Sequence, residues 1–242
     1  MSDIDKITDA ILDDDLLEVE RLINEENINE FNSYLITPLM LAAHYGRYYI
    51  VKSLIEHGAD INLCSPDDGY SAFLDALREN YERVALYLSE NGADIMVEGT
   101  QDGNTPLQYA IDYGMLDIAN KLLDKNCKIT GTNDMNVRVF DMVCERGYVD
   151  IMMKLLKMGA DINNKSTDGL TPLIRAIAKN HPKVVYLLLE AGADLTIADS
   201  NNNTPFDIAL DKEDDTIAKI MRGFMIEKNI DPNCVSNNYT FK

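Results

Sequence analysis

The sequence predicts an all-α solenoid, in which helix–turn–helix pairs stack along the chain, and two recurring landmarks support this prediction. The first marks a helix start and recurs as Thr37-Pro38-Leu39, Ser71-Ala72-Phe73, Thr105-Pro106-Leu107, Arg138-Val139-Phe140, Thr171-Pro172-Leu173 and Thr204-Pro205-Phe206. The second marks a helix end and recurs as Gly58-Ala59-Asp60, Gly92-Ala93-Asp94, Asn126-Cys127-Lys128, Gly159-Ala160-Asp161 and Gly192-Ala193-Asp194. Both landmarks step by 33 or 34 residues. Each period is therefore one structural unit that buries its apolar face against its neighbours.

One well-formed period shows why two helices are expected in each unit. Thr171 can cap the first helix because its hydroxyl can accept an amide of the first turn, and Pro172 suits the first helical position. Asn180 tolerates the left-handed conformation that ends a helix, and Gly192 can end the second helix in the same way. Between these two residues, Val184, Val185, Leu188 and Leu189 fall on one apolar stripe.

This pattern resembles the ankyrin repeat, a unit of about 33 residues with a T-P-L start, a turn and two helices. The resemblance covers nearly the whole chain and implies an ankyrin-repeat solenoid with β-turn or hairpin loops between successive helix pairs. One departure recurs. The family usually has a histidine after T-P-L that hydrogen-bonds within and between repeats, and here that position holds Met40, Leu74, Gln108, Asp141, Ile174 and Asp207. We therefore expect that polar network to be largely absent.

The resemblance predicts a single ankyrin-repeat domain over residues 1–242. It consists of an N-terminal capping repeat, five repeats, and a C-terminal capping repeat with a tail, over residues 1–35, 36–69, 70–103, 104–136, 137–169, 170–202 and 203–242. The fifth repeat is the most irregular, because Arg138 stands where threonine is usual and its helix start should be poorly capped. From Asp231 the polar tail is expected to be frayed or loosely docked.

The charge of the chain narrows the possible partners. The net charge is −19 over 242 residues, so the surface should repel nucleic-acid phosphates and anionic membranes. The acidic start lacks the basic segment followed by an apolar segment that is typical of a signal peptide. No apolar run approaches the ~18 residues that span a bilayer. We expect a cytoplasmic monomer, with an exported effector lacking a classical signal peptide as the alternative. Residues 1–36 hold eleven acids and two bases, which indicates a solvated cap, an acidic docking patch, or both.

No combination of residues predicts catalysis, a metal site or a cofactor. The three histidines, His44, His57 and His181, fall in different repeats. The four cysteines form neither a C-x-x-C pair nor a regular framework, which suits a reducing compartment. Cys144 occupies a core position of a first helix and is expected to be buried and inert. The protein is therefore expected not to be an enzyme.

The resemblance implies a concave binding face, made by the turn tips and the ends of the first helices. The residues that map to it and are expected to contact a partner are Tyr34, Ile36, His44, Tyr45, Asp67, Asp68, Tyr70, Arg78, Glu79, Asp102, Asp112, Tyr113, Met135, Glu145 and Arg146. Tyrosines are preferred interface anchors because they are large, stiff and amphipathic. We expect Tyr45, Tyr70 and Tyr113 to be exposed in one line on this face. Asp68, Asp102 and Asp112 should flank them.

These observations predict a non-catalytic protein-interaction module whose protein partner has a basic surface. Acidic steering should speed the encounter with such a partner. A narrower alternative is a stoichiometric inhibitor or immunity-type protein that masks a basic enzyme such as a nuclease. A second alternative is a regulatory subunit of an enzyme. The fold alone does not name the partner.

Overall fold

The computed structural model describes residues 2–97, 103–129 and 138–239. It divides into two compact units, residues 1–127 (unit 1) and 128–242 (unit 2), which are described separately. Over the described residues the chain forms fourteen α-helices in seven pairs, and its β-structure is limited to isolated bridge residues, namely Cys64 and Ser71, which pair with each other, and Arg138. The predicted all-α class and the predicted number of helix pairs are confirmed.

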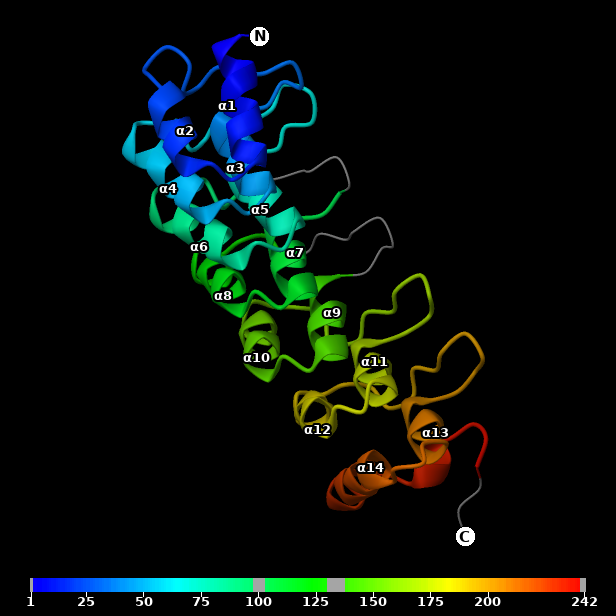
Figure 1. The fold of residues 1–242 in the computed structure, drawn as a ribbon. Coiled ribbons are helices and arrows are strands. Elements are labelled where there is room, and N and C mark those ends of the chain that lie inside the picture. The colour runs from blue at the N-terminus through cyan, green and yellow to red at the C-terminus, as the bar shows by residue number, and fades with distance from the viewer. Residues whose placement is uncertain (1, 98–102, 130–137, 240–242) are drawn as a thin grey trace. The chain divides into compact units, whose positions relative to one another are not determined.

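Unit 1 contains four helix pairs. They are α1 (Asp3–Leu12) with α2 (Leu16–Leu22), α3 (Pro38–His44) with α4 (Tyr48–Glu56), α5 (Ala72–Arg78) with α6 (Glu82–Glu90), and α7 (Pro106–Tyr113) with α8 (Leu116–Asp124). The first helices of successive pairs pack on one another, and the second helices do the same in a parallel row (Figure 1). Each pair therefore completes the core of its neighbour, as a repeat solenoid requires.

Unit 2 contains three helix pairs and a short 3-10 turn. They are α9 (Val139–Arg146) with α10 (Val149–Lys157), α11 (Pro172–Ala178) with α12 (Pro182–Glu190), α13 (Pro205–Leu210) with α14 (Thr216–Glu227), and η1 (Pro232–Cys234). Within this unit α11 packs between α9 and α13, and α12 packs on α14 (Figure 1).

The helix boundaries follow from local chemistry. The side chains of Thr37 and Thr171 accept the backbone N–H three residues later, and a proline follows each of them. Arg138 makes no such side-chain bond, but the carboxylate of Asp141 accepts the N–H of Arg138 at 3.3 Å, so the start predicted to be poorly capped is capped in part. The mid-repeat terminators are all left-handed, with φ of 68° at Gly46, 63° at Asn80, 75° at Gly114, 78° at Gly147 and 60° at Asn180.

Small residues allow the first helices to pack closely. Ala42, Ala76, Ala110 and Ala176 are completely buried, and Cys144 is buried as predicted. The position that usually holds histidine retains part of its polar role. The side chains of Gln108 and Asp207 accept the backbone N–H of Thr105 and Thr204, at 2.7 and 2.9 Å. The expected loss of polar bonding at this position is thus incomplete.

Asparagine side chains link successive turns within each unit. The Oδ1 atom of Asn29 accepts the N–H of Asp60 at 2.8 Å, and Asn62 does the same for Asp94 at 2.7 Å. In unit 2, Asn163 accepts the N–H of Asp194 at 2.8 Å. These bonds fix the spacing between repeats at the helix ends, where the backbone would otherwise lack partners.

The C-terminal tail is docked rather than frayed. The segment 229–231 replaces the Gly-Ala-Asp landmark, because Asn229 is left-handed and the N–H of Ile230 donates to the carbonyl of Met225 at 2.8 Å. Beyond η1, the hydroxyl of Ser236 and the N–H of Asn237 donate to the buried carboxylate of Asp207. The tail thus covers the open end of the last repeat, as a capping repeat must.

Candidate functional site

Unit 1 contains a hollow of about 390 Å³ on the side formed by turn tips and first helices. Its lining comes from α1, the turn before α3, the end of α3, the turn before α5, and α5 itself. Seven of the predicted partner-contacting residues line this hollow: Tyr34, Ile36, His44, Tyr45, Asp67, Asp68 and Arg78. Residues from three successive repeats therefore meet at one place.

One wall of the hollow is apolar and partly open to solvent. The side chain of Tyr34 is 74% exposed, that of Tyr45 is 43% exposed, and that of Leu12 is 39% exposed. The ring of Tyr45 stands edge-on to His44, with 4.9 Å between the ring centroids. The turn that carries Tyr34 is held by Asn32, whose Oδ1 accepts the N–H of Tyr34 at 2.9 Å. These large apolar groups are thus presented by an ordered backbone.

Another part of the lining is a charged cluster on α3 and α5. Arg78 has its Nη2 atom 3.4 Å from Oδ1 of Asp75, and its Nε atom donates to Oε1 of Glu79 at 3.1 Å. The guanidinium carbon also lies 4.6 Å from the centroid of the Tyr70 ring. Nδ1 of His44 lies 3.6 Å from Oδ1 of Asp75. The charge of Arg78 is therefore matched by carboxylates within the cluster.

Burial and proximity shift the pKa values of His44 and Asp75 in this cluster. The carboxylate of Asp75 stabilises the imidazolium and raises the pKa of His44 above 6.5. Desolvation raises the pKa of Asp75 itself, although His44 and Arg78 act in the opposite direction. Both shifts arise because the Asp75 carboxylate is largely buried and lies close to two basic side chains, His44 and Arg78.

The turn before α5 contributes two aspartates to the lining of the hollow. The N–H of Ser65 donates to the carbonyl of Tyr70, and the N–H of Gly69 donates to the carbonyl of Ser65, both at 2.9 Å. Oδ1 of Asp68 accepts the N–H of Tyr70 at 3.0 Å. The turn is thus fixed by its own backbone, which places Asp67 and Asp68 in the lining.

The expectation that Tyr70 is exposed is wrong. Its side chain is only 4% exposed, because the ring lies beneath the guanidinium of Arg78. Tyr45 directly follows α3 and Tyr113 is the last residue of α7; they are 43% and 44% exposed and occupy equivalent positions of their repeats, as does Glu79 directly after α5. Of the three tyrosines expected to be exposed in one line, only Tyr45 and Tyr113 are therefore exposed.

The other predicted residues lie elsewhere. Asp112 is exposed on α7. In unit 2, Glu145 binds the buried Arg175 at 3.0 Å and Lys179 at 3.1 Å, which gives it a structural role within the unit. Arg146 is exposed at the end of α9. Asp102 and Met135 lie outside the described residues.

Sequence reasoning missed five residues of the hollow: Thr8, Leu12, Leu41, Ser65 and Asp75. Leu12 follows Ile11, the last residue of the apolar stripe of α1, and so projects off the buried face. An apolar residue outside that stripe is the feature of the sequence that could have predicted the place of Leu12 in the hollow. The sequence contains no such feature for Asp75, because nothing in it indicates that a carboxylate of a first helix lies beside His44.

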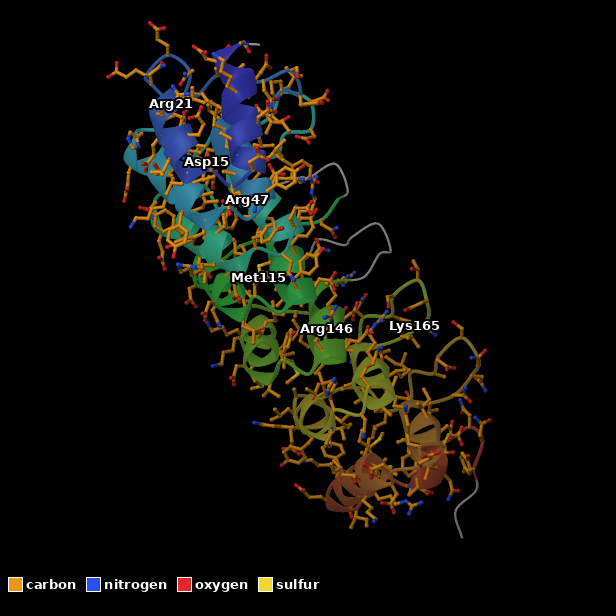
Figure 2. The ribbon with its side chains drawn as sticks, viewed as in Figure 1. Asp15, Arg21, Arg47, Met115, Arg146 and Lys165 are labelled. Carbon is orange, nitrogen blue, oxygen red and sulfur yellow. The ribbon has the colours of Figure 1, made fainter. Side chains whose placement is uncertain are left out.

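The reversal between α3 and α4 ties the second repeat to the first. Arg47, labelled in Figure 2, donates from Nη2 to the carbonyl of Leu12 at 2.7 Å, and its Nη1 atom lies 3.4 Å from Asp14. Leu12 is the last residue of α1 and part of the apolar wall. The wall is thus anchored to the neighbouring repeat by a charged hydrogen bond.

Comparison with known protein families identifies the family of this chain. The family model described as "Ankyrin repeats (3 copies)" matches residues 8–99 and 140–235, and the model described as "Ankyrin repeat" matches residues 102–134. The chain belongs to the ankyrin repeat family. Ankyrin repeats are in general protein–protein interaction modules and are typically not enzymes.

Solved ankyrin structures share the fold. The human ASB11 ankyrin repeat domain aligns over 90% of this chain and 96% of its own, with a TM-score of 0.67 and 22% identity. The Bcl-3 domain covers 90% of this chain and 98% of its own, with a TM-score of 0.64 and 22% identity. An ankyrin repeat domain from Acinetobacter baumannii AYE covers 77% of this chain and 97% of its own, with a TM-score of 0.63 and 28% identity.

Sequence relatives match only part of this chain. A putative ankyrin repeat protein of Borreliella burgdorferi is 30% identical over 96 residues, 40% of this chain and 43% of its own length. The Caenorhabditis elegans homologue of transient receptor potential cation channel subfamily A member 1 is 30% identical over 120 residues, 49% of this chain. This chain spans only 10% of that channel homologue. Over the residues the structure describes, no helix has the length and apolar character needed to cross a bilayer.

Proposed function

We propose that this ankyrin repeat protein is a non-catalytic interaction module that binds a protein partner through the hollow of unit 1. The observation that carries the proposal is the composition of the hollow. It places exposed aromatic and aliphatic groups, Tyr34, Tyr45 and Leu12, beside the acidic turn of Asp67 and Asp68. Large aromatic anchors at the centre of a depression, with charges around them, are typical of binding hot spots.

The partner we propose has a basic surface. The chain carries 41 acids against 22 bases, so its field attracts a basic protein and repels nucleic acid. The same charge supports the narrower alternative, a stoichiometric inhibitor that masks a basic enzyme such as a nuclease. The two differ in consequence: an inhibitor abolishes the activity of its partner at one equivalent, whereas a scaffold leaves it intact.

The test compares two tyrosines of similar exposure. Tyr45 lines the hollow, and Tyr186, which is 48% exposed on α12 of unit 2, does not. A partner is first captured from the native host with the unmodified chain, identified by mass spectrometry, and then titrated by calorimetry. Tyr45→Ala should weaken binding at least about tenfold, or about 1.4 kcal/mol, with an almost unchanged thermal midpoint.

Tyr186→Ala is the matched control and should bind like the unmodified chain. Equal affinity for both variants would place the binding surface elsewhere on the molecule. An assay of the captured partner, with and without one equivalent of this chain, separates inhibition from simple association.

A further inference from the structure

We propose that the hollow of unit 1 receives an arginine side chain of the partner, with its guanidinium at Asp67 and Asp68 and its aliphatic stem against the apolar wall. This inference rests on the proposed function, because it names the group that the hollow recognises. It concerns one chemical group, which can be tested without knowing the partner.

The charges that line the hollow favour a cation. Three aspartates, Asp67, Asp68 and Asp75, line the hollow together with two basic side chains, Arg78 and His44. Arg78 is matched within the cluster by Asp75 at 3.4 Å and by Glu79 at 3.1 Å. The lining thus carries more carboxylates than basic side chains. A partly enclosed place strengthens their attraction for a cation, because the local dielectric constant is lower than that of water.

The apolar wall selects a cation with a long, partly apolar side chain. Tyr34, Tyr45 and Leu12 offer exposed apolar surface that a bare metal ion would leave uncovered. An arginine buries its stem on such surface while its head remains with the acids. A planar guanidinium also stacks on aromatic rings and binds carboxylates with two parallel hydrogen bonds, which an ammonium does not. Arg78 already makes such a contact with Tyr70 inside this protein, at 4.6 Å.

The size of the hollow agrees with one side chain and part of its neighbours. Its volume of about 390 Å³ lies at the small end of the roughly 300–1,000 Å³ found for ligand pockets. Its lining is held in place by the backbone bonds of both turns, so little ordering is needed on binding.

The test uses N-acetyl-arginine amide and its neutral isostere N-acetyl-citrulline amide as probes. Each is titrated into the full-length, nitrogen-15-labelled chain, and the backbone amide signals are followed by NMR. The arginine probe should shift the signals of Tyr34, Tyr45 and Asp68 in a saturable way. The citrulline probe should bind at least about tenfold more weakly, which corresponds to about 1.4 kcal/mol.

Asp68→Asn and Asp60→Asn form a matched pair of variants. Each aspartate accepts the N–H two residues later through Oδ1, at 3.0 Å for Asp68 and 2.9 Å for Asp60, and asparagine keeps that acceptor. Only Asp68 lines the hollow. Asp68→Asn should therefore weaken the arginine probe at least about fivefold, about 1 kcal/mol, and Asp60→Asn should leave it unchanged.

Three results would overturn the inference: no saturable shift at the hollow, equal binding of both probes, or equal effects of the two variants. Because the titration needs no partner, these failures are distinct from failure of the proposed function. The proposed function would still be supported if the Tyr45→Ala variant failed to bind the captured partner and the Tyr186→Ala variant bound it normally.

Discussion

At the scale of single residues, His44 shows how two neighbouring repeats set the charge of one side chain. The imidazole sits at the end of α3, and the carboxylates of Asp75 and Glu79 on the next repeat lie 3.6 and 3.8 Å from Nδ1. The side chain is one-third exposed, so water screens part of this attraction. The pKa of His44 therefore depends on the packing of α3 against α5.

The raised pKa of His44 predicts a pH-dependent contribution to stability. The unfolded chain binds this proton with a pKa near 6.5, and the folded chain binds it more tightly. The contribution is therefore fully present below pH 6.5 and is lost as the pH rises through the folded-state value. His44→Gln should lower the free energy of unfolding by up to about 1 kcal/mol more at about pH 5.5 than at about pH 8.5. Urea unfolding of both proteins at the two pH values measures this, and a constant difference would contradict it.

At the scale of the helix pair, the reversal between α3 and α4 depends on a residue of the next repeat. The N–H of Gly46 donates to Ala43 and that of Arg47 to Ala42, at 3.1 and 2.8 Å, which is the Schellman pattern at a helix end. Tyr81, at the start of α6, places its ring against Gly46. A Cβ atom on Gly46 would lie 2.4 Å from that ring. The reversal thus requires glycine for two reasons, its left-handed backbone and its lack of a side chain.

Gly46→Ala and Gly58→Ala separate these two reasons. Both glycines are left-handed, with φ of 68° and 92°, but a Cβ on Gly58 meets no atom within 4 Å. Gly58→Ala should cost about 1–2 kcal/mol for the backbone alone. Gly46→Ala should cost roughly 1–3 kcal/mol more because Tyr81 must move. In a Tyr81→Ala background the excess should vanish in chemical denaturation, and an excess that persists would refute the role of the ring.

At the scale of the whole molecule, the net charge of −19 should speed the encounter with the basic partner that we propose. Residues 1–36 supply nearly half of this excess, and α1 also supplies part of the hollow. Charge on this scale acts mainly on the rate of encounter, because a complex already formed is held by short-range contacts.

Salt should therefore slow association more than it speeds dissociation. The screening length falls from about 10 Å at 0.1 M salt to about 3 Å at 1 M. Stopped-flow mixing with the captured partner across this range should show the association rate falling steeply, with a smaller change in the dissociation rate. The thermal midpoint of the chain at each salt concentration serves as the control. An association rate independent of salt would leave the charge as a determinant of solubility alone.

The sequence by itself determined the period, the helix pairs and the left-handed residues that end them. These features depend on contacts within about five residues, such as the Thr171 cap or the reversal at Asn180, so the pattern along the chain is sufficient to predict them. It also placed seven residues of the hollow, because equivalent positions in successive repeats lie side by side.

Only the tertiary structure decided which of these side chains are accessible and which distant groups join them. Tyr70 is buried because Arg78 lies over its ring, and Asp75 enters the hollow because α3 packs on α5. The tail is docked because Ser236 and Asn237 donate to Asp207, about thirty residues earlier. These contacts join groups on separate turns and helices, and their energy depends on burial and distance, which the order of residues along the chain does not contain.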